Sequence, residues 1–98
     1  MAYNLHITFG AEMETQNAVE YYFKISDLLV DRFLSELNIV YTKVAANPQF
    51  YKYIPKRQHR RFRYTRLKSF PFIVVFRVQE ESVVIYRVFN THRKPWYK

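Results

Sequence analysis

The chain has 98 residues, 49% of them hydrophobic and 19% aromatic, which suits one domain over residues 1–98 with a single core and excludes a disordered tail. It contains no cysteine, so disulfides, zinc–cysteine sites and thiol catalysis are excluded. The longest apolar run, residues 70–76, is far shorter than the roughly 20 residues of a membrane helix, and residues 1–10 lack the pattern of a secretory signal. We therefore expect a cytoplasmic protein without a membrane partner.

Charge is divided unevenly along the chain. Residues 1–47 hold three Lys and Arg against six Asp and Glu, a net charge of −3, whereas residues 48–98 hold thirteen against two, a net charge of +11. A domain with this asymmetry carries a strong positive field on one side. The pattern favours an anionic partner, which would be nucleic acid, a ribonucleoprotein or an acidic protein segment; the alternative is that the charge serves solubility alone.

Hydrophobic periodicity predicts the first two elements. Polar and apolar residues alternate over residues 4–9, which predicts a half-buried strand with Leu5, Ile7 and Phe9 on the core side, ended by Gly10. Over residues 11–25 the apolar residues recur at three- and four-residue steps, and acidic residues near the start suit a helix N-terminus. We therefore expect a first helix over residues 11–25.

A second helix is predicted from a cap at Ser26 or Asp27 to Asn47, because the residue before Pro48 is pushed out of the helical region. Its apolar positions form one stripe, made of Leu29, Phe33, Leu37, Val40, Tyr41 and Val44. The short break between the helices predicts an antiparallel helical hairpin packed on a sheet. Residues 48–57 are expected to form an aromatic-rich loop at the rim.

The second half of the chain is expected to form strands. Residues 60–68 alternate basic with apolar side chains, residues 72–78 and 83–89 are rich in β-branched and aromatic residues, and residues 79–82 have the composition of a hairpin turn. The last two strands should pair antiparallel. The fold class is thus α+β: an N-terminal strand, a helical hairpin, then a three-stranded antiparallel sheet with a basic face, followed by a basic tail over residues 90–98.

Several kinds of site are not indicated by the sequence. A single glycine gives no glycine-rich phosphate loop, and His6, His59 and His92 stand apart, without the spacing of a metal site. The adjacent Glu80 and Glu81 fit a solvated turn better than a catalytic pair. We expect neither a metal nor a small-molecule cofactor.

Basic residues interleaved with aromatic ones are the remaining signal, because clustered Lys and Arg bind phosphates and aromatic planes stack on single-stranded bases. The residues expected to bind the target are Arg60, Arg61, Arg63, Arg66, Lys68, Arg77, Arg87, Arg93 and Lys94. The alternatives are that Phe62 and Tyr64 pack in the core and that the arginines form a solvated or partner-covered face. His92 is a candidate general acid or base with Arg93 stabilising the transition state, although a lone histidine in a tail is more often inert.

Five short motifs follow one another along nearly the whole chain. They are Ala18-Val19-Glu20-Tyr21-Tyr22, Arg32-Phe33-Leu34-Ser35-Glu36-Leu37, Val44-Ala45-Ala46-Asn47-Pro48, Arg61 followed by Lys68-Ser69-Phe70-Pro71-Phe72, and Val88-Phe89-Asn90-Thr91-His92-Arg93-Lys94-Pro95. In this order and spacing they resemble the RelE/ParE toxin superfamily of type II toxin–antitoxin modules, also known as the plasmid-stabilisation family. The resemblance implies a small growth-inhibiting toxin that a cognate antitoxin protein neutralises by wrapping its surface.

Members of this superfamily either cleave mRNA on the ribosome or poison DNA gyrase. The mRNA-cleaving branch typically has arginines where this chain has Ile73 and Thr91, and related chains often have a histidine where Asn90 stands. The resemblance therefore favours a ParE-like toxin, with DNA gyrase as its target. Two alternatives stay open. One is a relic of the fold that binds nucleic acid or an antitoxin without toxicity; the other is a metal-free, ribosome-dependent mRNA endoribonuclease with the catalytic residues Arg66, His92, Arg93 and Tyr97.

Overall fold

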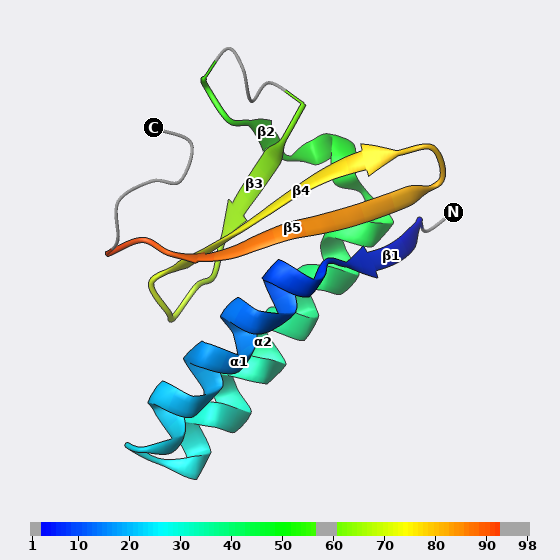
Figure 1. The fold of residues 1–98 in the computed structure, drawn as a ribbon. Helices are drawn as coiled ribbons and strands as arrows, with labels where there is room; N and C mark the ends of the chain where they lie inside the picture. The colour runs from blue at the N-terminus through cyan, green and yellow to red at the C-terminus, as the bar shows by residue number, and fades with distance from the viewer. Residues whose placement is uncertain (1–2, 57–60, 93–98) are drawn as a thin grey trace.

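The computed structural model describes residues 3–56 and 61–92 and has an α+β fold, as the sequence predicts (Figure 1). A five-stranded sheet, in the order β1-β5-β4-β3-β2, packs against a helical hairpin. β1 runs parallel to β5, and the other neighbouring strands are antiparallel. The strands are β1 (Asn4–Ile7), β2 (Lys52–Tyr53), β3 (Arg63–Arg66), β4 (Phe72–Gln79) and β5 (Ser82–Asn90); the helices are α1 (Phe9–Phe23), α2 (Asp27–Ala46) and the short 3-10 helix η1 (Pro48–Phe50).

The sheet is larger than the sequence predicts. The segment expected to be a loop contains η1 and the two-residue edge strand β2, and β1 joins the same sheet at its opposite edge. Of the strand expected over residues 60–68, the described residues 61–68 form strand only in β3. It ends there because the Leu67 N–H donates to the Phe72 carbonyl oxygen and so closes a tight connection to β4. The antiparallel pairing of β4 and β5 is confirmed.

The boundary between the first strand and the first helix also differs from the prediction. Thr8 caps α1 through its Oγ1, which accepts the Ala11 N–H at 3.2 Å, so Gly10 lies in the first helical turn and does not end a strand. The alternation over residues 4–9 is misleading, because Leu5 is 41% and Phe9 78% exposed. Ile7 is the member of that set that packs against the core.

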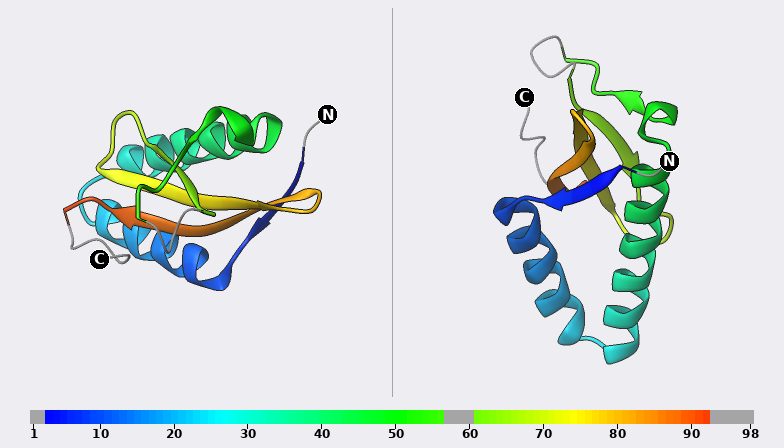
Figure 2. Two further views of the ribbon diagram at one scale, coloured as in Figure 1. Left: turned by 90° about the horizontal axis from the view of Figure 1, so that it is seen from above. Right: turned by 90° about the vertical axis from the view of Figure 1, so that its right-hand side faces the viewer.

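The helical hairpin forms where the sequence places it. Ser26 caps α2 through its Oγ, which accepts the Leu28 N–H at 3.1 Å, and α2 ends before Asn47 as predicted. α1 ends at Phe23, two residues earlier than expected. The two helices meet at the turn that lies farthest from the sheet and diverge toward it (Figure 2). None of the described helices is long and apolar enough to cross a membrane.

The main core lies between this hairpin and the sheet. The predicted stripe of α2 is confirmed, since all six of its residues are buried or pack against the buried cluster. Alternate residues of β4 point toward it, because side chains along a strand alternate between faces. The ring of Phe33 packs against those of Tyr22, Phe70 and Phe72 at centroid distances of 5.3–5.5 Å. The β4 residues in this core are Phe72, Val74 and Phe76.

The opposite face of the sheet carries a second, smaller apolar cluster. Ile73 and Val75 of β4 point away from the helices and meet Phe89 of β5. Phe62 and Tyr64 pack against this cluster and are partly buried. The core-packing alternative therefore holds for these two rings, and the face of the sheet that the helices leave open is not uniformly basic.

Candidate target-binding surface

The structure brings three of the predicted target-binding arginines together at one corner of the sheet. β4 continues past the first residue of β3, so its last residues have no partner in β3. At this corner a shallow hollow of about 470 Å³ is lined by Arg61, Arg63, Arg77, Tyr53 and Val78. This arginine hollow is the densest grouping of the predicted residues in the described part of the chain.

Arg63 is held in a fixed position within the hollow. Its Nη1 donates to the carbonyl oxygens of Tyr51 at 2.6 Å and Gln49 at 3.4 Å, and its Nη2 donates to the Tyr53 hydroxyl at 2.7 Å. The guanidinium carbon also lies 4.0 Å from the centroid of the Tyr53 ring, a cation–π contact. These contacts tie β3 to η1 and β2 and fix the edge strand in place.

Arg77 is supported by aromatic rings. Its guanidinium carbon lies 6.0 Å from the centroid of Phe62 and 5.7 Å from that of Tyr86, and its Nη2 donates to Gln79 Oε1 at 3.2 Å. The two rings contact each other edge to face at 5.0 Å. Tyr86 stands where the register between β4 and β5 shifts, so the bulge places its ring beneath the arginine. The guanidinium of Arg77 thus lies over two aromatic rings.

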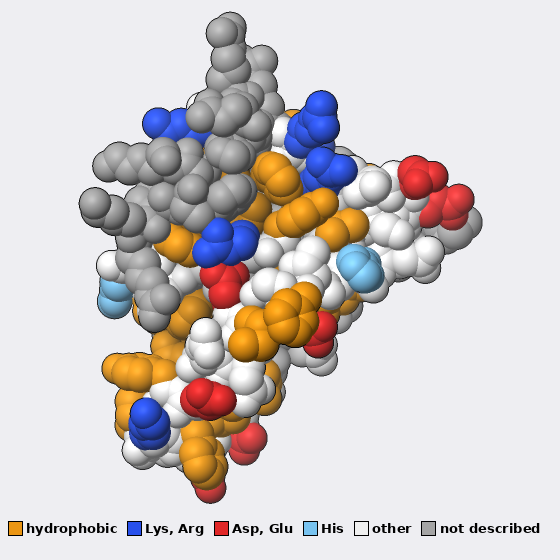
Figure 3. Space-filling model, viewed as in Figure 1, with side chains coloured by type: hydrophobic (Ala, Val, Ile, Leu, Met, Phe, Trp, Pro, Cys, Tyr) orange, Lys and Arg blue, Asp and Glu red, His pale blue; other side chains and the backbone are white. Residues whose placement is uncertain are grey.

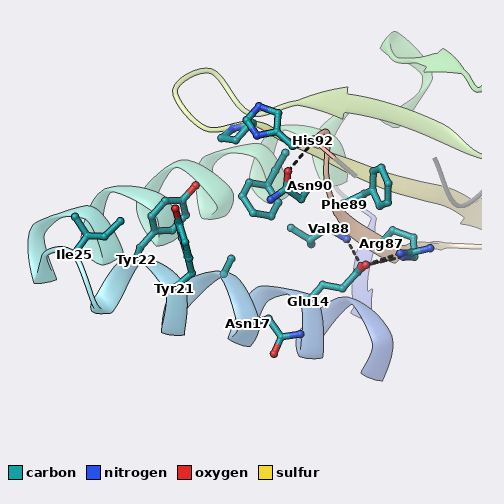
Figure 4. Close-up of a pocket in the computed structure, with 13 residues that line it drawn as sticks. Glu14, Asn17, Tyr21, Tyr22, Ile25, Arg87, Val88, Phe89, Asn90 and His92 are labelled. Carbon is teal, nitrogen blue, oxygen red and sulfur yellow. Dashed lines mark hydrogen bonds and ion pairs between the residues drawn. The ribbon is translucent and has the colours of Figure 1, made fainter. Parts of the chain in front are cut away.

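Arg87, another predicted binding residue, is engaged elsewhere. Its Nε lies 3.0 Å from each carboxylate oxygen of Glu14, and its Nη2 lies 2.6 Å from Oε2 (Figure 4). Glu14 also accepts the Val88 N–H at 2.9 Å. The two side chains are only 29% and 25% exposed. This ion pair fastens α1 to β5, so the structure gives Arg87 a part in holding the fold together.

Arg66 and Lys68 lie apart from the arginine hollow. They line an open groove of about 690 Å³ between β3 and α2. Glu36, on the α2 side, accepts the Ser69 N–H at 2.6 Å. The groove carries both signs of charge, so its attraction for an anion is weaker than that of three clustered arginines. Its other charged residues are Asp31, Arg32, Glu36 and Lys43.

His92 lies at the end of β5, beside a groove of about 470 Å³ between α1 and the sheet (Figure 4). Its backbone N–H donates to Asn90 Oδ1 at 2.8 Å, and its side chain is exposed. The basic residue that lines this groove is Arg87, which is already paired with Glu14. Arg66 lines the other groove, so the structure does not bring it together with His92. Four predicted site residues lie outside the described residues: Arg60, Arg93, Lys94 and Tyr97.

The middle of the open sheet face is apolar. Ile73 pairs with Arg66 of β3 and with Phe89 of β5, and it is 9% exposed. Val75 beside it is fully buried. These buried apolar side chains offer no polar group at the centre of the face to stabilise an anionic transition state. Among the described residues, no group of three His, Asp or Glu side chains is placed to hold a metal ion.

Some surface features were not expected from the sequence. Tyr53 was assigned to a loop, yet its ring forms part of the arginine hollow. At the tip of the helical hairpin, Tyr21, Phe23, Ile25 and Leu28 are 59–65% exposed. Tyr21, Phe23 and Leu28 are apolar at positions off the predicted core stripes, which was the signal available for this second feature. Ile25 belongs to the apolar repeat predicted for the first helix, and this expectation is wrong because α1 ends at Phe23 and leaves Ile25 exposed. In Figure 3, most Lys and Arg side chains in view lie over the sheet, whereas exposed hydrophobic side chains are prominent on the hairpin.

Comparison with known proteins gives a match to one family model over residues 7–95, nearly the whole chain; the family is described as the ParE toxin of type II toxin–antitoxin system, parDE. Among solved structures, the chain is similar to one from the chromosomal ParDE TA system of P. aeruginosa, with a TM-score of 0.78 and 17% sequence identity. That alignment covers 91% of this chain and 96% of the other. No curated protein matches the sequence.

Proposed function

The chain belongs to the ParE toxin family of type II toxin–antitoxin systems, and from this premise we propose that it arrests growth in the cytoplasm by binding DNA gyrase and that a cognate antitoxin neutralises it. The observation that carries the proposal is the family match over residues 7–95, because it spans the helical hairpin and strands β2 to β5. Three clustered arginines on one corner supply a surface suited to an anionic or mixed macromolecular target.

The apolar centre of the open sheet face favours binding over RNA cleavage. Metal-free cleavage of RNA needs cations around the reacting phosphate and a proton-transfer group within hydrogen-bond reach. Here Ile73 and Val75 occupy the middle of the face, and the candidates Arg66 and His92 line different grooves. An mRNA endoribonuclease on the ribosome is therefore the second candidate, supported by the exposed Arg66 and His92 as isolated groups.

Two assays on the purified protein separate these functions. The first follows the supercoiling of relaxed plasmid by gyrase; the second maps reporter mRNA ends by primer extension in cell-free translation, with and without ribosomes. We expect inhibition of supercoiling and intact mRNA. Cuts that appear only with ribosomes would replace the gyrase proposal by the ribonuclease. Protein whose induction leaves growth unaffected, and which inhibits neither reaction, would be a relic of the fold that only binds a partner.

Variants connect the activity to the surface. Arg61→Ala removes an exposed cation of the arginine hollow, and Arg93→Ala removes a cation of the predicted C-terminal site. Both are expected to relieve growth arrest without unfolding the protein. Lys24→Ala is the matched control, because it removes a positive charge from the exposed C-cap of α1, away from every predicted site residue in the described part of the chain. Full toxicity of both test variants would remove these residues from the site, and co-expression of the antitoxin should restore growth for every toxic variant.

A further inference from the structure

We propose that the arginine hollow binds the phosphodiester backbone of a nucleic acid, an activity of this chain by itself that requires neither gyrase nor an antitoxin. In the wall of the hollow, Arg61, Arg63 and Arg77 surround a shallow space of about 470 Å³. Three guanidinium groups facing one space repel one another, and an anion between them relieves this repulsion. Guanidinium forks also match the oxygens of a phosphate in shape.

No carboxylate in the described part of the chain neutralises the hollow. The ion pair found in the described part of the chain joins Arg87 to Glu14 and fastens α1 to β5. Neither of these two residues lines the hollow. Arg77 bonds to the neutral amide of Gln79, and the hollow's other wall residues are the uncharged Tyr53 and Val78. The positive charge of this corner is therefore left for a partner to compensate.

Two of the three arginines are already oriented. Arg63 is fixed by two backbone carbonyl oxygens and by the hydroxyl of Tyr53. Arg77 lies over the rings of Phe62 and Tyr86 and donates to Gln79 Oε1. Each of these bonds uses part of the guanidinium, which carries five N–H donors, so donors remain for an anion. A ligand that binds groups already held in place loses less side-chain entropy.

The form of the hollow favours nucleic acid over an acidic peptide. Arg61 is exposed and adds a third positive charge beside Arg63 and Arg77. The three charges together can contact successive phosphates of one strand. The Tyr53 ring is 51% exposed and offers an apolar plane beside the cations, where a sugar or base can lie. A flexible acidic peptide has no comparable flat groups between its charges.

The test uses fluorescence anisotropy with a short labelled oligonucleotide, in single-stranded and in duplex form, titrated with the full chain at several salt concentrations. We expect binding of at least one form that weakens as salt rises. Arg61→Ala and Arg77→Ala should each weaken it about tenfold, the loss of one charge-assisted contact. Each should also lower the slope of log K against log salt by about 1. Lys24→Ala removes a positive charge at the exposed C-cap of α1, outside the hollow and both grooves, and should leave affinity within about twofold.

Three results would overturn the proposal: no anisotropy change for either form at low salt, an equal loss of affinity in Lys24→Ala, or competition by poly-glutamate as effective as that by an unlabelled oligonucleotide of equal charge. Arg61→Ala removes an exposed side chain that makes no hydrogen bond in the described part of the chain, so its result does not depend on folding. Arg77→Lys keeps the charge but loses the planar fork, and should recover only part of the affinity. The oligonucleotide is the sole partner in the assay, so the outcome is independent of the gyrase proposal.

Discussion

Replacing Glu14 by alanine should destabilise the protein more than any other change of a single charged residue in its described part. The carboxylate accepts three contacts from Arg87, at 2.6–3.0 Å, and one from the Val88 N–H at 2.9 Å. Val88 is 1% exposed and its bond to Glu14 is partly buried, so its N–H would lose its partner in a poorly hydrated place. Leaving a buried donor unpaired costs about 1–3 kcal/mol.

The ion pair adds to this cost. Exposed pairs contribute about 0–1 kcal/mol and breaking a buried one costs about 3–5 kcal/mol; at 29% and 25% exposure this pair lies between these limits. We therefore expect Glu14→Ala to lower the free energy of unfolding by about 2–4 kcal/mol. Arg87→Ala should cost less, about 1–2 kcal/mol, because Glu14 keeps its bond to the Val88 N–H and can turn its other oxygen to water.

Urea unfolding followed by circular dichroism measures both variants and the double variant. The coupling energy between Glu14 and Arg87 should be about 1–2 kcal/mol and should persist at high salt, because the pair is largely shielded from solvent. Glu14→Gln serves as the matched control, since its amide oxygen can still accept the Val88 N–H. Coupling near zero, or a Glu14→Ala variant within about 0.5 kcal/mol of the parent, would refute the reasoning.

Three further changes test other parts of the fold. Ser26→Ala removes the N-cap of α2 and should cost about 1 kcal/mol in thermal or urea unfolding, whereas Ser26→Asp should not. Burial raises the pKa of Tyr41 to about 12, so the folded state favours its neutral form. The free energy of unfolding should therefore fall as pH rises from 10, the ordinary pKa of tyrosine, through 12. Tyr41→Phe should lessen that fall in unfolding curves measured at alkaline pH. Among the described residues the Tyr41 hydroxyl meets no partner at hydrogen-bond geometry, so Tyr41→Phe should also leave stability unchanged or slightly higher at neutral pH. Glu80 has a φ of 57° in the β4–β5 turn, and Glu80→Gly should stabilise by about 0.5–1 kcal/mol; a loss of stability would contradict a strained turn.

The sequence predicts those parts of the fold that depend on neighbours in the chain. The cap at Ser26, the α2 stripe and the β4–β5 hairpin each have a local signal, and each is confirmed. β2 has no such signal, because two residues are too few for a pattern and the strand is held by bonds from Arg63. Thr8 is a helix cap inside a stretch that alternates like a strand, and the cap determines where α1 begins.

The arrangement of the arginines could be predicted only in part. The sequence identifies the basic half of the chain, and Arg61, Arg63 and Arg77 do share one corner. It could not show that Arg87 pairs with Glu14, because the two residues are 73 positions apart and meet only once α1 packs on β5. The sequence also could not show that β4 extends beyond its pairing with β3, because strand register is set by tertiary packing. This end of β4, which has no partner in β3, is what leaves room for the hollow.

The short strands at the two edges of the sheet have a consequence for aggregation. β4 and β5, with the sequences FIVVFRVQ and SVVIYRVFN, are the long apolar strands of the kind that pair with copies of themselves when exposed. In the fold they lie inside, and the sheet ends instead in β1, of four residues, and β2, of two. A chain trimmed up to Thr8 would lose β1 and uncover the hydrogen-bonding edge of β5. Proteolytic loss of a few N-terminal residues would thus favour self-association through the uncovered edge of β5.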